Sequence, residues 1–279
     1  MPEGPEVRYY AEIFNQFIHI PINELSIVNP RYTKDSKPLS DSLFLNSTII
    51  QVKSHGKLLF IYFEKPTGEK FYMILGFGLT GHIYECDVQQ VPPDSNSIMF
   101  KMFFTDTNKC IYLKDNMRFG TITITTDIED VVKKMDSPDL MNKSLKDDIY
   151  VERFSKFAKK NITVVLINQK AFAGCGNYLK CEVLYRCHIH PLATVQQLSR
   201  KTLTNLIKTL RKLMWESFEH QKNGDWKYGK EESAFNNWLQ VYRKQFTSKD
   251  EHVNVLNTPD RRKTYWVEFP LVSDNEEEV

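Results

Sequence analysis

The chain has 279 residues, of which 41% are hydrophobic and 26% charged, with a net charge of +2. This length suffices for one large domain or two medium ones, each with its own core. No apolar run approaches the roughly 20 residues that cross a bilayer, and the first ten residues lack the apolar core of a signal peptide, so we expect an intracellular protein without a membrane segment. The five cysteines form no C-x-x-C pair, which disfavours a disulfide framework and a four-cysteine zinc site.

The charges are distributed unevenly along the chain. Residues 1–130 carry 12 basic and 16 acidic side chains, residues 131–272 carry 25 and 15, and residues 273–279 carry four acids. The middle block is therefore strongly basic. Such a block suits a polyanion such as DNA, because neutralised phosphates release counterions, although many basic segments are only solvated surfaces.

In the first half, a short helix is expected at residues 6–17 and strands between residues 48 and 125. β-branched and aromatic runs alternate there with turn residues, which predicts hairpins in an antiparallel sandwich. The six expected strands are TIIQVK, KLLFIYFE, KFYMILGF, SIMFKMFF, CIYLK and GTITIT. A charged stretch around residues 127–146 then indicates a domain boundary.

The second half is predicted to be mainly helical. Apolar residues at three-four spacing, from Leu203 to Phe218, predict an amphipathic helix. The segment 161–169 is rich in β-branched residues, and propensity alone predicts a strand there. Beyond Trp238, the runs LQVYRKQF and KTYWVEF flank a polar interval and predict a β-hairpin.

Four motifs occur in one order along the chain, namely PEGPE, GLTGH, MRFG and AGCGNYLKCEVLYRCHIHP. This combination resembles the formamidopyrimidine-DNA glycosylase and endonuclease VIII family, from Pro2 to about Val267. The resemblance implies an α+β fold of two domains. It places an N-terminal helix and an antiparallel β-sandwich in the first domain and a helix-two-turn-helix in the second, and it makes segment 161–169 a buried helix.

The C-terminal segment, where family members have a finger motif, departs from the family pattern. Many members carry a four-cysteine zinc finger after a segment like LQVY, whereas this chain continues without cysteine. Arg262 to Trp266 still resembles the finger's arginine, threonine and aromatic pattern, with Val267 where a ligand cysteine would follow. The resemblance thus implies a zincless finger, packed by Tyr265, Trp266 and Phe269, with no metal or other cofactor.

These features define five expected regions. They are a catalytic β-sandwich domain at residues 1–130, a linker at 131–145, a helical domain at 146–235, a zincless β-hairpin finger at 236–272 and a disordered acidic tail at 273–279.

The first motif carries the expected chemistry. Read alone, Pro2 starts a helix, and Glu3 and Glu6 favour its N-terminal dipole. The resemblance implies instead that removal of Met1 leaves the Pro2 amine as the nucleophile, with Glu3 as acid and base and Glu6 in support. Lys57 matches a family lysine that assists at the phosphate beside the lesion; without the family context it would be an exposed lysine at a strand edge.

Other residues are expected to bind DNA. Leu79, Arg118 and Phe119 match side chains that the family inserts into the hole left by an everted nucleotide, although Leu79 and Phe119 are also typical of a core. Gln169 and Asn177 belong to the helix-two-turn-helix, where Asn177 would donate to a phosphate.

Further residues of the second half have structural or alternative roles. Glu182, Leu184 and Tyr185 are expected to hold the helix that follows Asn177. His188 and His190 favour a turn or a phosphate contact over a metal site. Arg262 is the expected finger arginine, which binds phosphate and aids the later elimination, and Arg261 is the alternative.

The sequence therefore predicts a base-excision-repair DNA glycosylase with abasic-site (AP) lyase activity. We expect it to remove oxidised bases, preferably pyrimidines, through a Schiff base on Pro2, and to cleave the strand by β/δ-elimination. It would act as a monomer on damaged DNA, in the nucleus, nucleoid or equivalent compartment. The alternative is a non-catalytic protein that binds damaged DNA. Loss of Pro2, Glu3 or Lys57 would favour this alternative, but all three residues are present.

Overall fold

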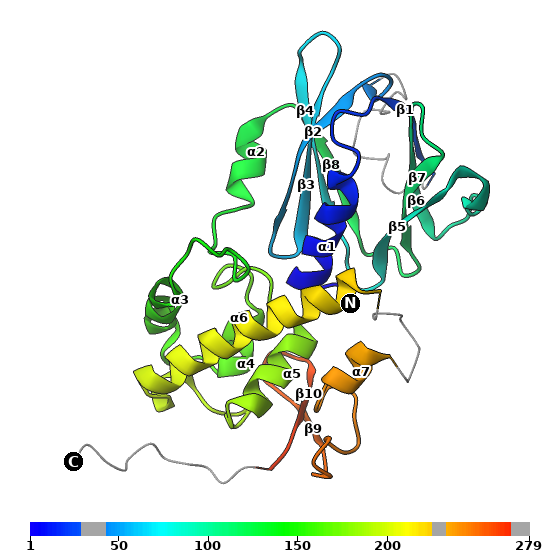
Figure 1. The fold of residues 1–279 in the computed structure, drawn as a ribbon. Helices are drawn as coiled ribbons and strands as arrows, with labels where there is room; N and C mark the ends of the chain where they lie inside the picture. The colour runs from blue at the N-terminus through cyan, green and yellow to red at the C-terminus, as the bar shows by residue number, and fades with distance from the viewer. Residues whose placement is uncertain (29–42, 225–232, 269–279) are drawn as a thin grey trace. The chain divides into compact units, whose positions relative to one another are not determined.

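The computed structural model describes residues 1–28, 43–224 and 233–268 (Figure 1). Contacts divide the chain into two compact units, Met1–Asp136 and Ser137–Val279. This division falls inside the segment 131–145, which the sequence predicts as a linker. Phe269 and the acidic tail lie outside the described residues.

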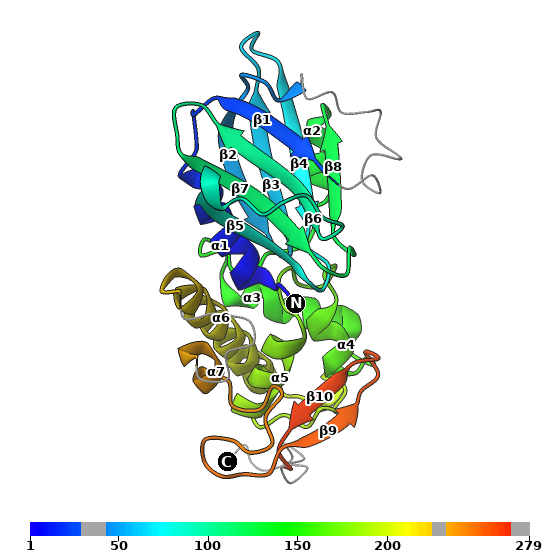
Figure 2. The same ribbon diagram turned by 90° about the vertical axis from the view of Figure 1, so that its right-hand side faces the viewer.

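The first unit contains two four-stranded antiparallel sheets, which Figure 2 shows as two layers. In spatial order the first sheet has β1 (Ile22–Ile27), β6 (Ile98–Phe104), β7 (Lys109–Asp115) and β5 (Gly81–Asp87), and the second has β2 (Thr48–His55), β3 (Leu58–Glu64), β4 (Lys70–Gly76) and β8 (Thr121–Thr125). All six predicted strands are present, and the predicted sandwich is confirmed. A 3₁₀ turn, η3 (Val88–Gln90), and a short helix, α2 (Ile128–Lys133), complete the unit.

One apolar core joins the two sheets and the N-terminal helix α1 (Gly4–Asn15). Phe63 and Phe71 of the second sheet stack with ring centroids 4.9 Å apart, and Phe100 of the first sheet belongs to the same cluster. The helix contributes Phe14, which is fully buried. Burial of these large side chains is the main source of stability for the sandwich, and it fixes the helix against β2 and β3.

The sequence did not predict β1 or β5. Both strands are at the edges of their sheet, and each pairs with a single neighbour. An edge strand is half exposed, so its apolar alternation is weak: β5 reads GHIYECD, and only Gly81 and Ile83 are buried.

The second unit is helical and ends in a two-stranded ribbon. Its elements are α3 (Asp147–Arg153), η4 (Phe154–Phe157), α4 (Ile162–Ile167), α5 (Asn177–Arg186), η5 (Val195–Gln197), α6 (Arg200–Lys222), α7 (Ala234–Trp238), β9 (Asn254–Asn257) and β10 (Lys263–Trp266). The predicted amphipathic helix corresponds to α6, whose buried face includes Leu206, Leu210 and Met214. No helix of the described residues is long and apolar enough to cross a membrane.

The β-branched segment 161–169 forms the helix α4, as the family resemblance implies. The side chain of Asn161 caps this helix by accepting the N–H of Thr163 at 2.9 Å. Ile162, Val165 and Leu166 are completely buried. Tertiary packing of this apolar face outweighs the preference of β-branched residues for strands.

The predicted first strand of the hairpin, LQVYRKQF, is wrong. Residues 239–245 form an irregular segment of bends and a turn, and Phe246 forms only an isolated bridge with His252. β10 pairs instead with β9, in the register Lys263 to Asn257. The reason lies in Glu182 of α5, whose buried carboxylate accepts the backbone N–H groups of residues 240, 241 and 242 at 2.9–3.1 Å. These donors are therefore not available to a sheet partner.

Candidate functional site

The chain enters helix α1 through a capping box. Glu3 is the N-cap residue, and its backbone N–H donates to the Glu6 carboxylate at 2.7 Å, while its own side chain accepts from the helix. Pro2, Glu3 and Glu6 are all buried. The cap therefore fixes the backbone of Glu3 and places Pro2 immediately before a rigid helix, with two carboxylates close by. Glu6 serves this cap.

A histidine that the sequence analysis left without a role lies near the N-terminus. The hydroxyl of Tyr10, on α1, is 2.7 Å from Nδ1 of His82, the last residue of GLTGH. Burial lowers the pKa of His82 to about 4; the positively charged N-terminal amine acts in the same direction, and Asp115 opposes it. His82 is thus a neutral imidazole at neutral pH, within electrostatic range of the amine. The sequence signal for a role of His82 was its place in the motif GLTGH.

Lys57 lies in the tight turn between β2 and β3. Gly56, which precedes it, has φ +55°, a conformation that glycine adopts without steric cost. Lys57 itself is half-buried rather than fully exposed. Because α1 packs against both β2 and β3, this turn belongs to the same rigid layer as the N-terminal helix.

Two loops of the first unit expose large apolar side chains. Leu79 is 37% exposed, and on the second loop Met117 and Phe119 are 46% and 52% exposed. Arg118, which lies between Met117 and Phe119, has φ +58°, an unusual conformation for a non-glycine residue. The alternative that Leu79 and Phe119 are core residues is therefore wrong, because both face solvent. Apolar side chains gathered on exposed loops indicate a binding surface.

In the second unit, Gln169 shapes the two turns between α4 and α5. Its amide nitrogen donates to the carbonyls of Ile167 and Cys175, both at 2.9 Å, and its oxygen accepts the N–H of Gly174 at 3.0 Å. Gly174 has φ +113°, which only glycine adopts readily. Both ends of the Gln169 amide are thus occupied by backbone, so its structural role is to fix the turns that precede α5.

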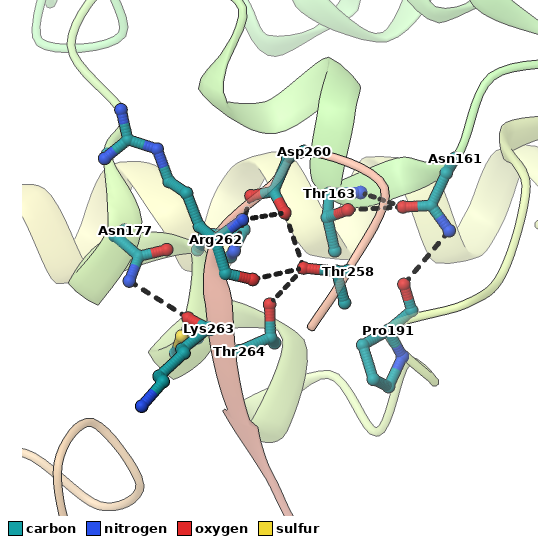
Figure 3. A network of polar contacts seen from close by, with 12 residues as sticks. Asn161, Thr163, Asn177, Pro191, Thr258, Asp260, Arg262, Lys263 and Thr264 are labelled. Carbon is teal, nitrogen blue, oxygen red and sulfur yellow. Dashed lines mark hydrogen bonds and ion pairs between the residues drawn. The ribbon is translucent and has the colours of Figure 1, made fainter. Parts of the chain in front are cut away.

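Asn177 begins α5 and contacts the ribbon. Its side-chain nitrogen donates to the carbonyl of Lys263 at 3.1 Å (Figure 3), and its buried side-chain oxygen has no hydrogen-bond partner among the described residues. One amide hydrogen is therefore used within the protein. Gly176 is the N-cap residue of α5 and has no side chain that could cap the helix. The N-terminus of a helix is electrostatically favourable for an anion.

A buried ion pair fixes the turn of the ribbon. Lys180 of α5 and Asp260 are both fully buried, with Nζ and Oδ2 2.6 Å apart. Asp260 also accepts the Thr258 hydroxyl at 2.5 Å and the N–H of Arg262 at 3.3 Å (Figure 3). Arg262 is half-buried, whereas Arg261 is exposed with φ +61°. One carboxylate therefore sets the backbone from which both candidate arginines project.

Apolar packing holds the base of the ribbon. Val267 is buried in a cluster with Cys181, Tyr185, Val241 and Val253, against which Tyr265 also packs. Trp266 packs against His190 in a T-shaped arrangement, with the ring centroids 4.6 Å apart. The residues described for the finger contain no cysteine, and a zinc ion does not fit the apolar side chains at its base.

His188 and His190 end α5 in a turn. His188 has φ +53°, and Nδ1 of His190 accepts the N–H of Leu192 at 3.2 Å. Burial lowers the pKa of His190. Within the described residues, no group of three or more His, Cys, Asp or Glu is arranged to hold a metal ion.

Comparison with known proteins places these two units in one family. Residues 1–122 match the formamidopyrimidine-DNA glycosylase N-terminal domain, and residues 137–227 match the formamidopyrimidine-DNA glycosylase H2TH domain.

Individual relatives are distant in sequence. Formamidopyrimidine-DNA glycosylase of Arabidopsis thaliana is 26% identical over 63% of this chain, which spans 46% of that protein. Endonuclease 8 of Pectobacterium atrosepticum is 23% identical over 75% of this chain and 77% of its own length. A crystal structure of Lactococcus lactis formamido-pyrimidine DNA glycosylase, bound non-covalently to DNA with an AP site, shares the fold with a TM-score of 0.78 at 20% identity, over 95% of this chain and 97% of that one.

Proposed function

Since the chain belongs to the formamidopyrimidine-DNA glycosylase and endonuclease VIII family, we propose that it excises damaged bases from DNA and then cleaves the strand at the resulting AP site. The observation that carries the proposal is the capped start of α1. It holds a buried proline at position 2 next to the buried carboxylate of Glu3.

The proposed reaction begins once Met1 has been removed. Peptide α-amino groups have a pKa of about 8, so an N-terminal amine such as that of Pro2 is partly unprotonated at neutral pH. Its lone pair forms a bond to C1′ of the damaged nucleotide, and the electrons of the glycosidic bond leave with the base, which takes up a proton. Opening of the sugar, with a proton passing to O4′, gives an iminium ion between Pro2 and C1′. Glu3 is the proposed proton donor and acceptor for these steps, a role that contributes roughly 10²–10⁴-fold.

Strand cleavage follows from the iminium. It acidifies the C2′ proton, and loss of that proton expels the 3′ phosphate in β-elimination. A second loss, from C4′, expels the 5′ phosphate in δ-elimination, and water then releases Pro2. We assign Lys57 to the phosphate beside the lesion and Arg262, with Arg261 as the alternative, to the phosphate that leaves in the second elimination. A bound guanidinium stabilises the charge that develops on a leaving phosphate.

The DNA contacts are proposed from the loops and the charge distribution. Leu79, Arg118 and Phe119 would fill the space left by the everted nucleotide, which recovers part of the unstacking cost. Asn177 and the first turn of α5 would bind phosphate, with Gln169 holding that turn in shape rather than contacting DNA itself. The basic block at residues 131–272 would supply non-specific affinity, and oxidised pyrimidines remain the proposed lesions. This activity belongs in the compartment that holds DNA.

Borohydride trapping tests the nucleophile. The full chain with Met1 removed is incubated with an oligonucleotide containing one AP site, and borohydride reduces the iminium to a stable crosslink. We expect a crosslink that maps to Pro2 by peptide mass. The matched control is the same chain with one residue added before Pro2, which converts the amine to an amide and should abolish trapping. Absence of a crosslink with the processed chain, or its persistence in the extended chain, contradicts the proposal.

A further inference from the structure

The two loops that carry Leu79 and Phe119 are joined by one buried carboxylate. Asp115, the last residue of β7, is completely buried. Its Oδ2 accepts the backbone N–H of Gly120 at 2.7 Å, and its Oδ1 accepts the hydroxyl of Thr80. Gly120 follows Phe119 and Thr80 follows Leu79. The Asp115 side chain thus accepts hydrogen bonds from the residue directly after Leu79 and from the residue directly after Phe119.

The hydroxyl of Thr80 forms a second link between the loops. Besides donating to Asp115, it accepts the backbone N–H of Met117 at 2.8 Å. A hydroxyl can donate one hydrogen bond while it accepts another, so both links exist at the same time. Thr80 therefore ties the loop of Leu79 to Asp115 and Met117, at the start of the loop that contains Arg118.

The two backbones are also in direct contact. Gly78 has φ +56°, and a Cβ atom on it would come within 2.7 Å of the Phe119 carbonyl carbon. A Cβ atom on Gly120 would come within 2.8 Å of the Gly76 carbonyl oxygen. Any larger residue at either place would push the loops apart. The glycines of GLTGH and MRFG thus permit the approach that Asp115 and Thr80 then hold.

This arrangement keeps apolar side chains facing water. Leu79, Met117 and Phe119 are exposed, and exposure of apolar area to water is unfavourable. The hydrogen bonds to Asp115 are formed by buried or half-buried groups, and a hydrogen bond to a carboxylate is stronger than one between neutral groups. They offset that cost and hold the side chains outward before any DNA is bound.

We propose that Asp115 and Thr80 are positioning residues that lock the loops of Leu79 and Phe119 into one preformed wedge for duplex DNA. This inference rests on the proposed function and extends it. A preformed wedge avoids the entropy cost of ordering loops at the moment when the nucleotide leaves the helix. It matters only where a stacked duplex must be opened, because a single strand has no stacked partner to separate and no hole to fill.

The test compares one AP-site strand in two forms, single-stranded and annealed to its complement, in single-turnover cleavage. In Thr80→Val the shape remains but the hydroxyl is lost, and in Asp115→Asn one acceptor oxygen is replaced by a donor. We expect each variant to lower the duplex rate about tenfold while the single-strand rate changes less than about twofold. Thr80→Ser keeps the hydroxyl and should retain the duplex rate.

The matched control is Thr107→Val. Thr107 lies in the turn between β6 and β7, where its hydroxyl donates to the Phe104 carbonyl at 3.2 Å and, like that of Thr80, accepts a backbone N–H, that of Lys109 at 3.4 Å. It touches neither loop of the wedge, so both rates should stay at the wild-type level.

The outcomes separate the inference from the proposed function. Equal losses on both DNA forms, or no loss on the duplex, overturn the positioning role. Failure of the wild-type chain to cleave or to be trapped on either DNA form overturns the proposed function instead. Borohydride trapping of Thr80→Val on the single strand shows that the variant is folded.

Discussion

The buried pair of Lys180 and Asp260 gives a quantitative test of how the ribbon is held. Replacement of Lys180 by Met removes the ammonium group and leaves the Asp260 carboxylate buried without its counter-ion. Loss of one partner of a buried ion pair costs about 3–5 kcal/mol, whereas an exposed pair contributes about 0–1 kcal/mol. Lys180→Met should therefore lower the free energy of unfolding of the second unit by about 3–5 kcal/mol.

The chain offers a convenient signal for this measurement. All four tryptophans, Trp215, Trp226, Trp238 and Trp266, are in the second unit, so their fluorescence during urea unfolding reports on that unit alone. The control is Lys212→Met on α6, because Lys212 pairs with Glu216 at 3.7 Å with its side chain 76% exposed. Its effect should stay below about 1 kcal/mol.

A double variant separates charge from packing. With Lys180→Met in place, Asp260→Asn removes the unpaired charge but keeps a side-chain oxygen that can accept from Thr258 and the N–H of Arg262. We expect the double variant to be more stable than Lys180→Met alone, by about 1–3 kcal/mol. A loss of less than about 1 kcal/mol in Lys180→Met, or a double variant as unstable as the sum of the single ones, would refute the reasoning.

Further predictions concern individual groups. Because the pKa of His82 is lowered to about 4 from an unfolded value near ~6.5, the unfolded chain binds this proton first as the pH falls. The contribution to stability is complete above about pH 6.5 and is lost between about pH 6.5 and 4, and thermal denaturation of His82→Asn should show a weaker loss over this range. Glu182→Gln should lower the urea stability of the second unit by about 2 kcal/mol, as the carboxylate that accepts three N–H groups becomes neutral. Arg262→Ala should make the plot of log affinity for undamaged duplex against log salt concentration less steep, by about one in slope. Fluorescence anisotropy measures this affinity, and an unchanged slope would favour Arg261 as the phosphate-binding arginine.

The fold was predictable where local patterns and burial agree. The run KFYMILGF became β4 because its apolar residues fill the core between two sheets. The edge strand β5 escaped prediction because half of it faces solvent, and LQVYRKQF was misread because the acceptor for its backbone, Glu182, is about 58 residues away in sequence. Such long-range hydrogen bonds leave no periodicity in the segment that they shape.

For the site, family motifs indicated Leu79 and Phe119 but not the residues that hold them. Asp115 lies two residues before MRFG, and Thr80 and His82 lie inside GLTGH. No spacing rule states that the Asp115 carboxylate reaches a loop 35 residues earlier, since this depends on the pairing of β5 with β7, in which Gly81 is opposite Asp115. Residue types were readable from the sequence, whereas their partners required the sheet register.

The same physical arrangement occurs three times in loops that carry proposed DNA contacts or adjoin them. Asp115, Glu182 and Asp260 are each buried at or beside a regular element, and each accepts at least one backbone N–H from an irregular segment. An irregular loop has N–H groups without ladder partners, and a carboxylate is the strongest acceptor available to fix them. It follows that a neutral isostere at any of the three positions should impair DNA processing through the loop it fixes, while substitution of an exposed acid such as Glu129 should leave processing unchanged.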